Sequence, residues 1–138
     1  MQNTPFERVL VTGGTGFIGR YVIARLVASG HRPTVTQFGI VPGDFEHDLQ
    51  VDLIDLDLRD NAETANLVST LKPDLVVHLA GVTGQSDPEG RLCEEINHRA
   101  TVHLLDRLTE IDLSKVIMVG TAAEYGQQPT PFREDMPD

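Results

Sequence analysis

The chain is poor in cysteine and has no long hydrophobic segment. Its 138 residues include one cysteine, Cys93, so no internal disulfide can form and nothing indicates a secreted scaffold. No apolar run approaches the ~20 residues that a membrane-spanning helix needs. The N-terminal residues also lack the basic stretch and apolar core of a secretory signal. We therefore expect a globular, cytoplasmic protein, or a fragment of one, with no membrane partner.

Positive charge is scarce as well. Lys and Arg total 11 against 21 Asp and Glu, which gives a formal net charge of −10. A protein that binds a phosphate backbone needs a basic face, so this balance argues against a nucleic-acid partner. The length suits one domain, which is large enough to bury a core without disulfides or metals. No set of histidines and carboxylates has the spacing of metal ligands, so we expect no metal site.

Short strand-like runs alternate with helix-like segments along the chain. Strands are expected at residues 8–12, 33–38, 52–57, 75–80 and 116–119, and helices at 17–29, 60–71 and 91–110, with loops at 39–50 and 81–90. Gly30 is expected to end the first helix and Asp60 to cap the second. This alternation is typical of βαβ units. It predicts an α/β fold, a doubly wound, Rossmann-like parallel sheet with strand order 3-2-1-4-5.

A glycine-rich loop carries the strongest functional signal. Residues 12–19 read TGGTGFIG and contain G-x-G-x-x-G at Gly14, Gly16 and Gly19, between a predicted strand and a predicted helix. An early glycine supplies a tight turn, Gly16 lets backbone approach a pyrophosphate, and Gly19 allows close packing of helix on strand. The helix N-terminus then offers N–H donors to phosphates. The loop predicts a dinucleotide site, with an ordinary glycine-rich turn as the alternative.

A Walker-type phosphate loop is excluded. That motif needs a lysine directly after its last glycine, and the chain has only Lys72 and Lys115.

Other candidate residues follow the predicted strands. Asp57, Ala80 to Gly81 and Thr121 stand at carboxyl ends of strands, the edge where open α/β sheets bind ligands. Asp57 is expected either to accept a hydrogen bond from an adenine amine or to be a solvated carboxylate. His78 lies within an apolar strand and is expected to be a satisfied core histidine. Asn97 falls in the middle of a predicted helix, where asparagine is unfavourable. It either fixes the helix against the sheet or is simply tolerated.

Cys93 lies on the long predicted helix. We expect it to be a small buried apolar residue.

The sequence resembles the extended short-chain dehydrogenase/reductase family, the NAD(P)-dependent nucleotide-sugar epimerases, dehydratases and reductases. The resemblance covers the whole chain through five motifs in order. These are TGGTGFIG at 12–19 (T-G-x-x-G-x-x-G), DLRD at 57–60 (D-[LI]-R-D), HLAG at 78–81 (H-x-A-[AG]), NHRAT at 97–101 (N-V-x-G-T) and TAAEYG at 121–126 ([ST]-x-x-x-Y-G).

The resemblance implies a role for many individual residues. Thr121 matches the catalytic Ser/Thr, whose hydroxyl donates to a sugar oxygen; the alternative is a threonine in a turn. The implied cofactor-binding residues are Gly13, Gly16, Phe17, Ile18, Gly19, Gln37, Asp57, Leu58, Leu79, Ala80, Gly81, Thr83 and Asn97. Residues 1–138 would form the dinucleotide-binding domain of an epimerase or 4-keto reductase that moves hydride with NAD or NADP and acts on a nucleotide sugar. Members of the family often pair through helices, so a homodimer is a further expectation.

One departure concerns catalysis. The family's Tyr-x-x-x-Lys pair is missing, because Tyr21 is followed four residues later by Arg25, and Tyr125 by Pro129. We expect the chain to be an N-terminal portion that lacks the substrate domain and is inactive alone. The alternative is a non-catalytic dinucleotide-binding module that senses redox state or scaffolds a partner. A Tyr-x-x-x-Lys motif in the coding sequence beyond codon 138 favours the enzyme; a stop codon favours the module.

A second departure concerns the choice of cofactor. Gln37 stands where dinucleotide sites usually carry an acid that holds the adenosine ribose, and no acid occurs from His31 to Gly43. Gln37 can still bind a hydroxyl, whereas the missing carboxylate removes repulsion against a 2′-phosphate, for which Arg20 and Arg32 are candidate partners. The sequence leaves NAD and NADP open.

A third departure concerns the reaction. The family's sugar 4,6-dehydratases carry an acid two residues before the motif tyrosine, where this chain has Ala123, with Glu124 one residue later. Neighbouring side chains on an extended segment point to opposite sides, so we expect an epimerase or reductase rather than a dehydratase.

Overall fold

The computed structural model describes residues 6–39, 50–84, 87–121, 126, 133 and 135. Its strands are β1 (Val9–Thr12), β2 (Thr34–Gln37), β3 (Asp52–Asp55), β4 (Leu75–His78) and β5 (Lys115–Met118). Its helices are α1 (Gly19–Ala28), α2 (Asn61–Leu71), the π-helix η1 (Cys93–Ala100) and α3 (Thr101–Leu108). The strands form one five-stranded parallel sheet ordered β3-β2-β1-β4-β5, so the predicted fold class and strand order are confirmed.

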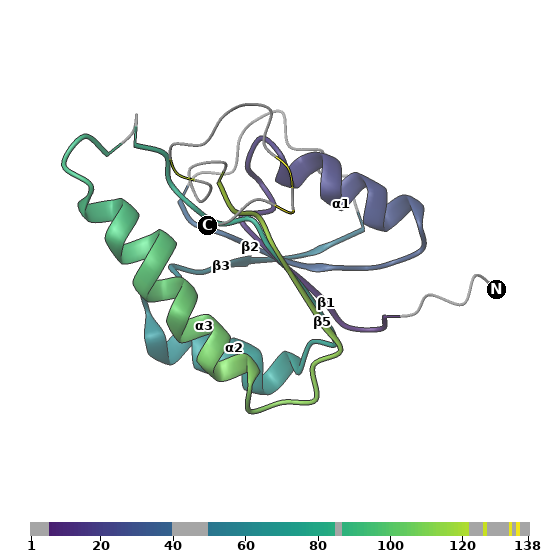
Figure 1. Ribbon diagram of the computed structural model, residues 1–138. Helices are drawn as coiled ribbons and strands as arrows, with labels where there is room; N and C mark the ends of the chain where they lie inside the picture. The colour runs from purple at the N-terminus through teal and green to yellow at the C-terminus, as the bar shows by residue number, and fades with distance from the viewer. Residues whose placement is uncertain are drawn as a thin grey trace.

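Helices cover both faces of this sheet (Figure 1). Successive side chains of a strand point to opposite faces, so Val9 and Val11 pack with Ile23 of α1. Leu10, between them, packs with Val68 of α2 and Leu104 of α3. β1 and β4 are buried along their whole length, which explains why both read as continuous or β-branched apolar runs.

The first helix begins two residues later than predicted. Phe17 and Ile18 precede α1 and are 75% and 53% exposed, so they belong to the loop although their apolar character suggested a helix. The predicted end is confirmed. Gly30 has φ +89°, its N–H donates to the Val27 carbonyl, and the His31 N–H donates to the Leu26 carbonyl. These two bonds form the Schellman arrangement that glycine favours at a helix end.

The second helix starts as predicted. Asp60 Oδ1 accepts hydrogen bonds from the backbone N–H groups of Ala62 and Glu63 at 3.0 and 2.9 Å. The helix ends at Leu71, its C-cap residue Lys72 has a left-handed φ of 46°, and a buried Pro73 follows.

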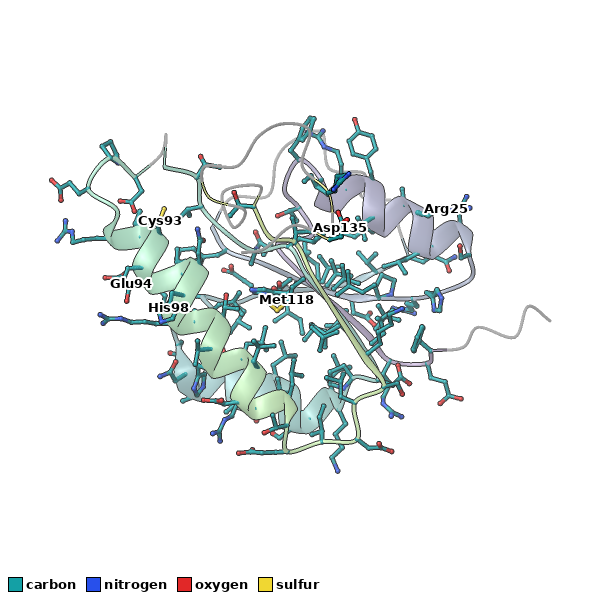
Figure 2. The ribbon with its side chains drawn as sticks, viewed as in Figure 1. Arg25, Cys93, Glu94, His98, Met118 and Asp135 are labelled. Carbon is teal, nitrogen blue, oxygen red and sulfur yellow. The ribbon has the colours of Figure 1, made fainter. Side chains whose placement is uncertain are left out.

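The helix predicted at 91–110 is present, but a π-helix forms its middle part and an α-helix its last part. Helical structure begins at Arg91, residues 93–100 form the π-helix, and α3 ends at Leu108. In a π-helix, residues five apart lie one above the other. Accordingly, Thr101 Oγ1 donates to the Ile96 carbonyl at 3.3 Å, and Arg99 Nε lies 3.2 Å from Glu94 Oε1. Glu94 and His98 project from the side of this helix that faces away from the sheet (Figure 2).

All five strands differ from their predicted ranges by one or two residues at one or both ends, and β4, for example, ends at His78 rather than at residue 80. β3 ends at Asp55, two residues earlier than expected, and Leu56 and Leu58 continue as a buried segment that packs with Ala100. β5 runs from Lys115 to Met118, one residue ahead of the predicted range. Most of the predicted loop at 39–50 lies outside the described residues. No helix within the described residues is long and apolar enough to cross a membrane.

Candidate functional site

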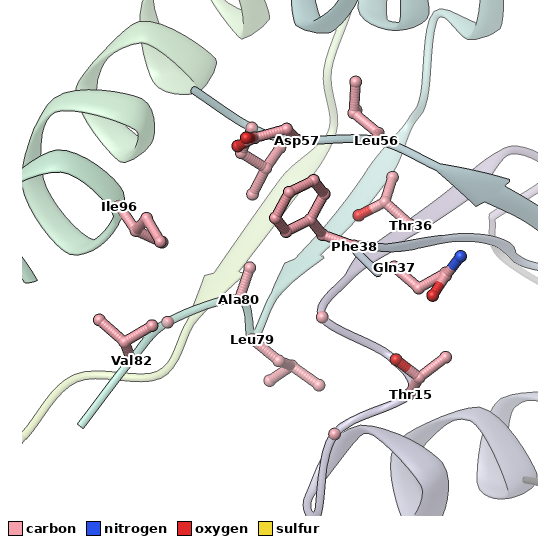
Figure 3. Close-up of a pocket in the computed structure, with 14 residues that line it drawn as sticks. Thr15, Thr36, Gln37, Phe38, Leu56, Asp57, Leu79, Ala80, Val82 and Ile96 are labelled. Carbon is pink, nitrogen blue, oxygen red and sulfur yellow. The ribbon is translucent and has the colours of Figure 1, made fainter. Parts of the chain in front are cut away.

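Two neighbouring cavities open at the carboxyl edge of the sheet. The first, of about 300 Å³, is bounded by the glycine loop, the end of β2, the segment after β3 and the turn after β4 (Figure 3). The second, of about 710 Å³, is bounded by the same turn, the π-helix and the end of β5. Residues Leu79 to Val82 line both cavities, so an elongated ligand can lie along the edge and occupy both.

The predicted site residues divide between these cavities. The first is lined by Gly13, Gly16, Gln37, Asp57, Leu58, Leu79, Ala80 and Gly81. The second is lined by Leu79, Ala80, Gly81, Thr83, Asn97 and Thr121. Phe17, Ile18 and Gly19 line neither cavity. Ala123, Glu124 and Tyr125 lie outside the described residues. Within the part of the chain that is described, no group of His, Cys, Asp and Glu could hold a metal ion.

The glycine loop is shaped by what each glycine touches. Gly13 has φ +65°, and a Cβ there would lie 2.6 Å from the backbone N and Cα of Ala80. Only glycine therefore allows the loop to press against the turn after β4. Gly16 is exposed, and a Cβ there would meet only the Gly13 carbonyl oxygen, at 3.2 Å. The backbone at Gly16 thus faces open space, as close approach by a ligand requires.

The role predicted for Gly19 is wrong. A Cβ at Gly19 would collide with the loop's own backbone, at 2.5 Å from the Gly13 carbonyl oxygen, rather than with a strand. The glycine that brings helix and strand together is Gly14, whose Cβ would lie 2.6 Å from Ile23 Cδ1 and 2.5 Å from Val35 Cγ1.

The start of α1 is suited to an anion. Its N-cap residue, Ile18, provides no side-chain hydrogen bond, and the first turn holds no acidic residue. The partial positive charge at this helix end is therefore not offset within the helix and can attract a phosphate despite the net charge of −10.

Asp57 is paired rather than simply solvated. Arg59 Nη2 donates to Asp57 Oδ2 at 2.7 Å, and Arg59 Nε lies 3.0 Å from both carboxylate oxygens. The hydrogen bonds from Arg59 lower the pKa of Asp57, so the carboxylate is ionised at neutral pH. Arg59 Nη1 also contacts Glu95 at 3.4 Å. The pairing fixes the carboxylate at the cavity wall, and its contact with adenine stays a prediction.

Phe38 is a cavity residue that the sequence analysis missed. The residue is 65% exposed, and its ring points into the space between Asp57 and Ala80 (Figure 3). The guanidinium of Arg59 lies 5.7 Å from the ring centroid, within cation–π range. The available signal was an aromatic residue directly after Gln37, at the ligand-binding end of a predicted strand.

The two arginines considered for a 2′-phosphate do not line the first cavity. Arg32 Nη2 is 2.7 Å from Asp52 Oδ1, and Asp52 is the first residue of β3, at the end away from the cavities. The guanidinium of Arg20 lies 5.7 and 5.9 Å from the ring centroids of Phe17 and Tyr21.

His78 is the satisfied core histidine that the sequence predicted. It is 5% exposed, and its Nδ1 lies 2.6 Å from Thr12 Oγ1 while its Nε2 lies 2.9 Å from Thr101 Oγ1. Thr12 Oγ1 also accepts from the Ala80 N–H at 3.4 Å, and Thr101 Oγ1 donates to the Ile96 carbonyl. Burial lowers the pKa of His78. The network connects β1, β4 and α3 beside the second cavity.

Asn97 holds the turn after β4. Its Oδ1 accepts from the Val82 N–H at 2.9 Å, and its Nδ2 donates to the Val82 carbonyl at 2.8 Å. The expected fixing role is present, although the partner is the turn rather than the sheet. Cys93 is half-buried and lines the second cavity, so it is not the small buried apolar residue that was expected. Desolvation and the nearby Asp87 raise the pKa of its thiol.

A family model described as the NAD dependent epimerase/dehydratase family matches residues 9–138. The chain belongs to the NAD dependent epimerase/dehydratase family. This confirms the resemblance to the extended short-chain dehydrogenases/reductases that the motifs indicated.

Individual members of the epimerase/dehydratase family match nearly all of the chain. UDP-glucose 4-epimerase 2 of Oryza sativa subsp. japonica is 29% identical over 94% of this chain and 35% of its own length. UDP-N-acetyl-alpha-D-glucosaminuronate decarboxylase of Bacillus cytotoxicus is 31% identical over 94% of this chain and 41% of its own. The crystal structure of UDP-glucose 4-epimerase from Bifidobacterium longum, in complex with NAD+ and UDP, has a TM-score of 0.81 at 27% identity and covers 94% of this chain and 42% of that one. The chain therefore spans about two-fifths of the length of these relatives.

Proposed function

We propose that residues 1–138 form the dinucleotide-binding domain of a nucleotide-sugar epimerase or 4-keto reductase. The observation that carries the proposal is the glycine loop, in which Gly13 is closed against Ala80 while the backbone at Gly16 faces open space beside the uncapped start of α1. A diphosphate fits this arrangement, because it needs backbone N–H donors and room that a Cβ would fill. The relatives named above, one of which is bound to NAD+ in its crystal structure, support the proposal.

The two halves of the cofactor take the two cavities. Asp57, Leu58 and Gln37 hold the adenosine half in the first cavity, where the Asp57 carboxylate accepts from the adenine amine. The glycine loop, with Phe17, Ile18 and Gly19, carries the diphosphate. The remaining cofactor residues, Leu79, Ala80, Gly81, Thr83 and Asn97, form the wall along which the nicotinamide half lies. The cofactor supplies the hydride acceptor when it is bound.

Thr121 is the catalytic hydroxyl in this proposal. It lines the second cavity at the end of β5, where it can donate a hydrogen bond to a sugar oxygen and stabilise charge that develops there. A tyrosine and a lysine in Tyr-x-x-x-Lys are missing from the 138 residues, so we infer that the chain performs no turnover alone. The nucleotide-sugar substrate, a homodimer and a cytoplasmic location stay predictions for the protein as a whole.

Titration of the purified chain with NADH, followed by calorimetry, tests the binding proposal. We expect one binding event per chain and, in the presence of NADH, slower hydrogen exchange of the backbone amides in residues 13–19. Lack of both effects at millimolar NADH would overturn the proposal. A separate assay with UDP-glucose and NAD+ should give no UDP-galactose, and any steady turnover by the 138-residue chain would contradict the predicted inactivity.

A further inference from the structure

Phe38 is a large apolar side chain that the core does not use. It is the first residue beyond β2, it is 65% exposed, and it packs in none of the three apolar clusters that the described residues form. Gln37, the last residue of β2, is tied to the neighbouring strand, since its Nε2 donates to Asp55 Oδ1 at 3.2 Å. The side chain of Phe38 is instead left at the wall of the first cavity.

The ring is nevertheless held in place. The guanidinium of Arg59 lies 5.7 Å from its centroid, and a guanidinium can stack on an aromatic face while its N–H groups bind other partners. Those N–H groups contact Asp57 at 2.7 and 3.0 Å and Glu95 at 3.4 Å. Two carboxylates therefore fix the cation, and the cation restrains the ring before any ligand binds.

The space in front of the ring suits a flat group that has apolar faces and a polar edge. Its other walls include the apolar side chains of Leu56, Leu58, Leu79, Ala80, Val82 and Ile96. The ring points into the space between Ala80 and the carboxylate of Asp57 (Figure 3). A nucleobase offers a π-face to the ring, and its amine can donate to the carboxylate. A sugar or an aliphatic chain has no π-face to stack.

We propose that Phe38 is the platform on which the adenine base stacks, and that Arg59 is a positioning residue that holds the ring ready. Every base has a π-face, so stacking tolerates any base. Phe38 therefore determines how tightly the base is held, whereas the carboxylate of Asp57 determines which base is preferred. This inference rests on the proposed function, because it requires the adenosine half to lie in the first cavity.

Calorimetric titration of the full chain with NADH and with 5′-AMP tests the platform. Phe38→Leu keeps an apolar side chain without a π-face and should weaken both ligands by at least about threefold, and Phe38→Ala by about tenfold or more. Phe38→Tyr keeps the ring and should stay within about twofold of the wild type. Tyr21→Leu is the matched control, because Tyr21 is also 65% exposed but lines neither cavity. It should bind both ligands as the wild type does.

Reduced nicotinamide hypoxanthine dinucleotide separates affinity from the choice of base. Hypoxanthine has a carbonyl oxygen where adenine has its amine, so it cannot donate to Asp57 from that position. Phe38→Ala should weaken this compound and NADH by the same factor, to within about twofold. Asp57→Asn should instead narrow the preference for NADH, because an amide can donate to the carbonyl oxygen.

The positioning role of Arg59 is tested through Phe38. Arg59→Lys keeps the positive charge beside Asp57 but removes the planar group that stacks on the ring. Its effect on 5′-AMP affinity should be at least about twofold smaller in the Phe38→Leu background than in the wild type. Equal effects in the two backgrounds would overturn the role of Arg59.

Other outcomes separate this inference from the function on which it rests. Wild-type affinity for NADH and 5′-AMP in Phe38→Leu, or a changed preference between the two bases in Phe38→Ala, would overturn the platform and leave the proposed function standing. Failure of the wild type to bind NADH would overturn the proposed function instead. Because Phe38 lies outside the core, its variants should keep the wild-type melting temperature, which thermal unfolding checks.

Discussion

His78 Nε2 lies 2.9 Å from Thr101 Oγ1, which joins the last residue of β4 to the first residue of α3. Because Thr101 uses its own proton on the Ile96 carbonyl, it accepts from His78, so Nε2 carries the imidazole proton. Nδ1 is then an acceptor for the Thr12 hydroxyl, which in turn accepts from the Ala80 N–H. All donors in this series of hydrogen bonds point the same way, and a neutral histidine satisfies them.

The first prediction concerns pH. Burial lowers the pKa of His78 in the folded state from its ordinary value of 6.5, so the unfolded chain binds this proton more readily. The stability contributed by neutral His78 is fully present above about pH 6.5 and is lost as the pH falls from there toward the lower folded pKa. Urea unfolding followed between pH 7.5 and 5 should show this loss.

The control for the pH prediction is His98, an exposed residue of the π-helix. His78→Gln should lower the free energy of unfolding at pH 7.5 by about 1–3 kcal/mol and flatten its pH dependence. His98→Gln should do neither. An unaltered pH profile in His78→Gln would contradict the assignment.

The second prediction separates two glycines of one loop. Gly19→Ala places a Cβ against the carbonyl oxygens of the loop and should reduce the free energy of unfolding by more than about 2 kcal/mol. Gly16→Ala meets only one atom, at 3.2 Å, and should cost less than about 1 kcal/mol. We expect Gly16→Ala nevertheless to weaken NADH by at least about tenfold.

Thermal unfolding and calorimetric titration of both glycine variants check this prediction. Ser69→Ala, at an exposed position of α2, is the control for both measurements. Normal NADH affinity in a folded Gly16→Ala protein would mean that no phosphate approaches this backbone.

The third prediction concerns Asn97. Asn97→Ala removes both hydrogen bonds to Val82, so the Val82 amide should exchange its hydrogen at least about tenfold faster in the variant. Hydrogen exchange followed by NMR measures this directly. Arg99→Ala, which removes an exposed contact with Glu94 on the same π-helix, should leave Val82 unaffected.

The fourth prediction concerns the cap of α2. Asp60→Ala removes the acceptor for two backbone N–H groups and should lower the free energy of unfolding by about 1 kcal/mol, measured in urea. Asp106→Ala, an exposed acid on α3, controls for the change in net charge. Equal stability of the two variants would show that the cap contributes nothing.

The sequence was sufficient to predict the fold because the relevant signals are local. Continuous apolar strands such as Leu75–His78, separated by helices, specify a parallel sheet buried on both faces. The caps at Asp60 and Gly30 were predicted for the same reason, since each acts within a few residues of its own position. The helix start was missed because Phe17 and Ile18 are apolar and yet exposed.

The site could be predicted only where a motif specifies it. The role of Gly19 and that of Gly14 depend on which atoms approach a missing Cβ, and sequence spacing does not reveal those neighbours. The pairing of Gln37 with Asp55 depends on the register between two strands, which the sequence leaves undetermined. The π-helix was also missed, because the polar segment Glu94–Arg99 contains little apolar periodicity from which a register could be read.

The π-helix sets the direction in which the side chains ahead of α3 point. Residues 93–100 carry hydrogen bonds that span five positions, whereas α3 returns to four. Deleting one residue within this segment would restore a uniform α-helix. The helical residues on the N-terminal side of the deletion would then turn by about 100° relative to α3. A protein with one residue fewer in this segment would therefore present a different set of side chains to the second cavity, even where its motifs agree letter for letter.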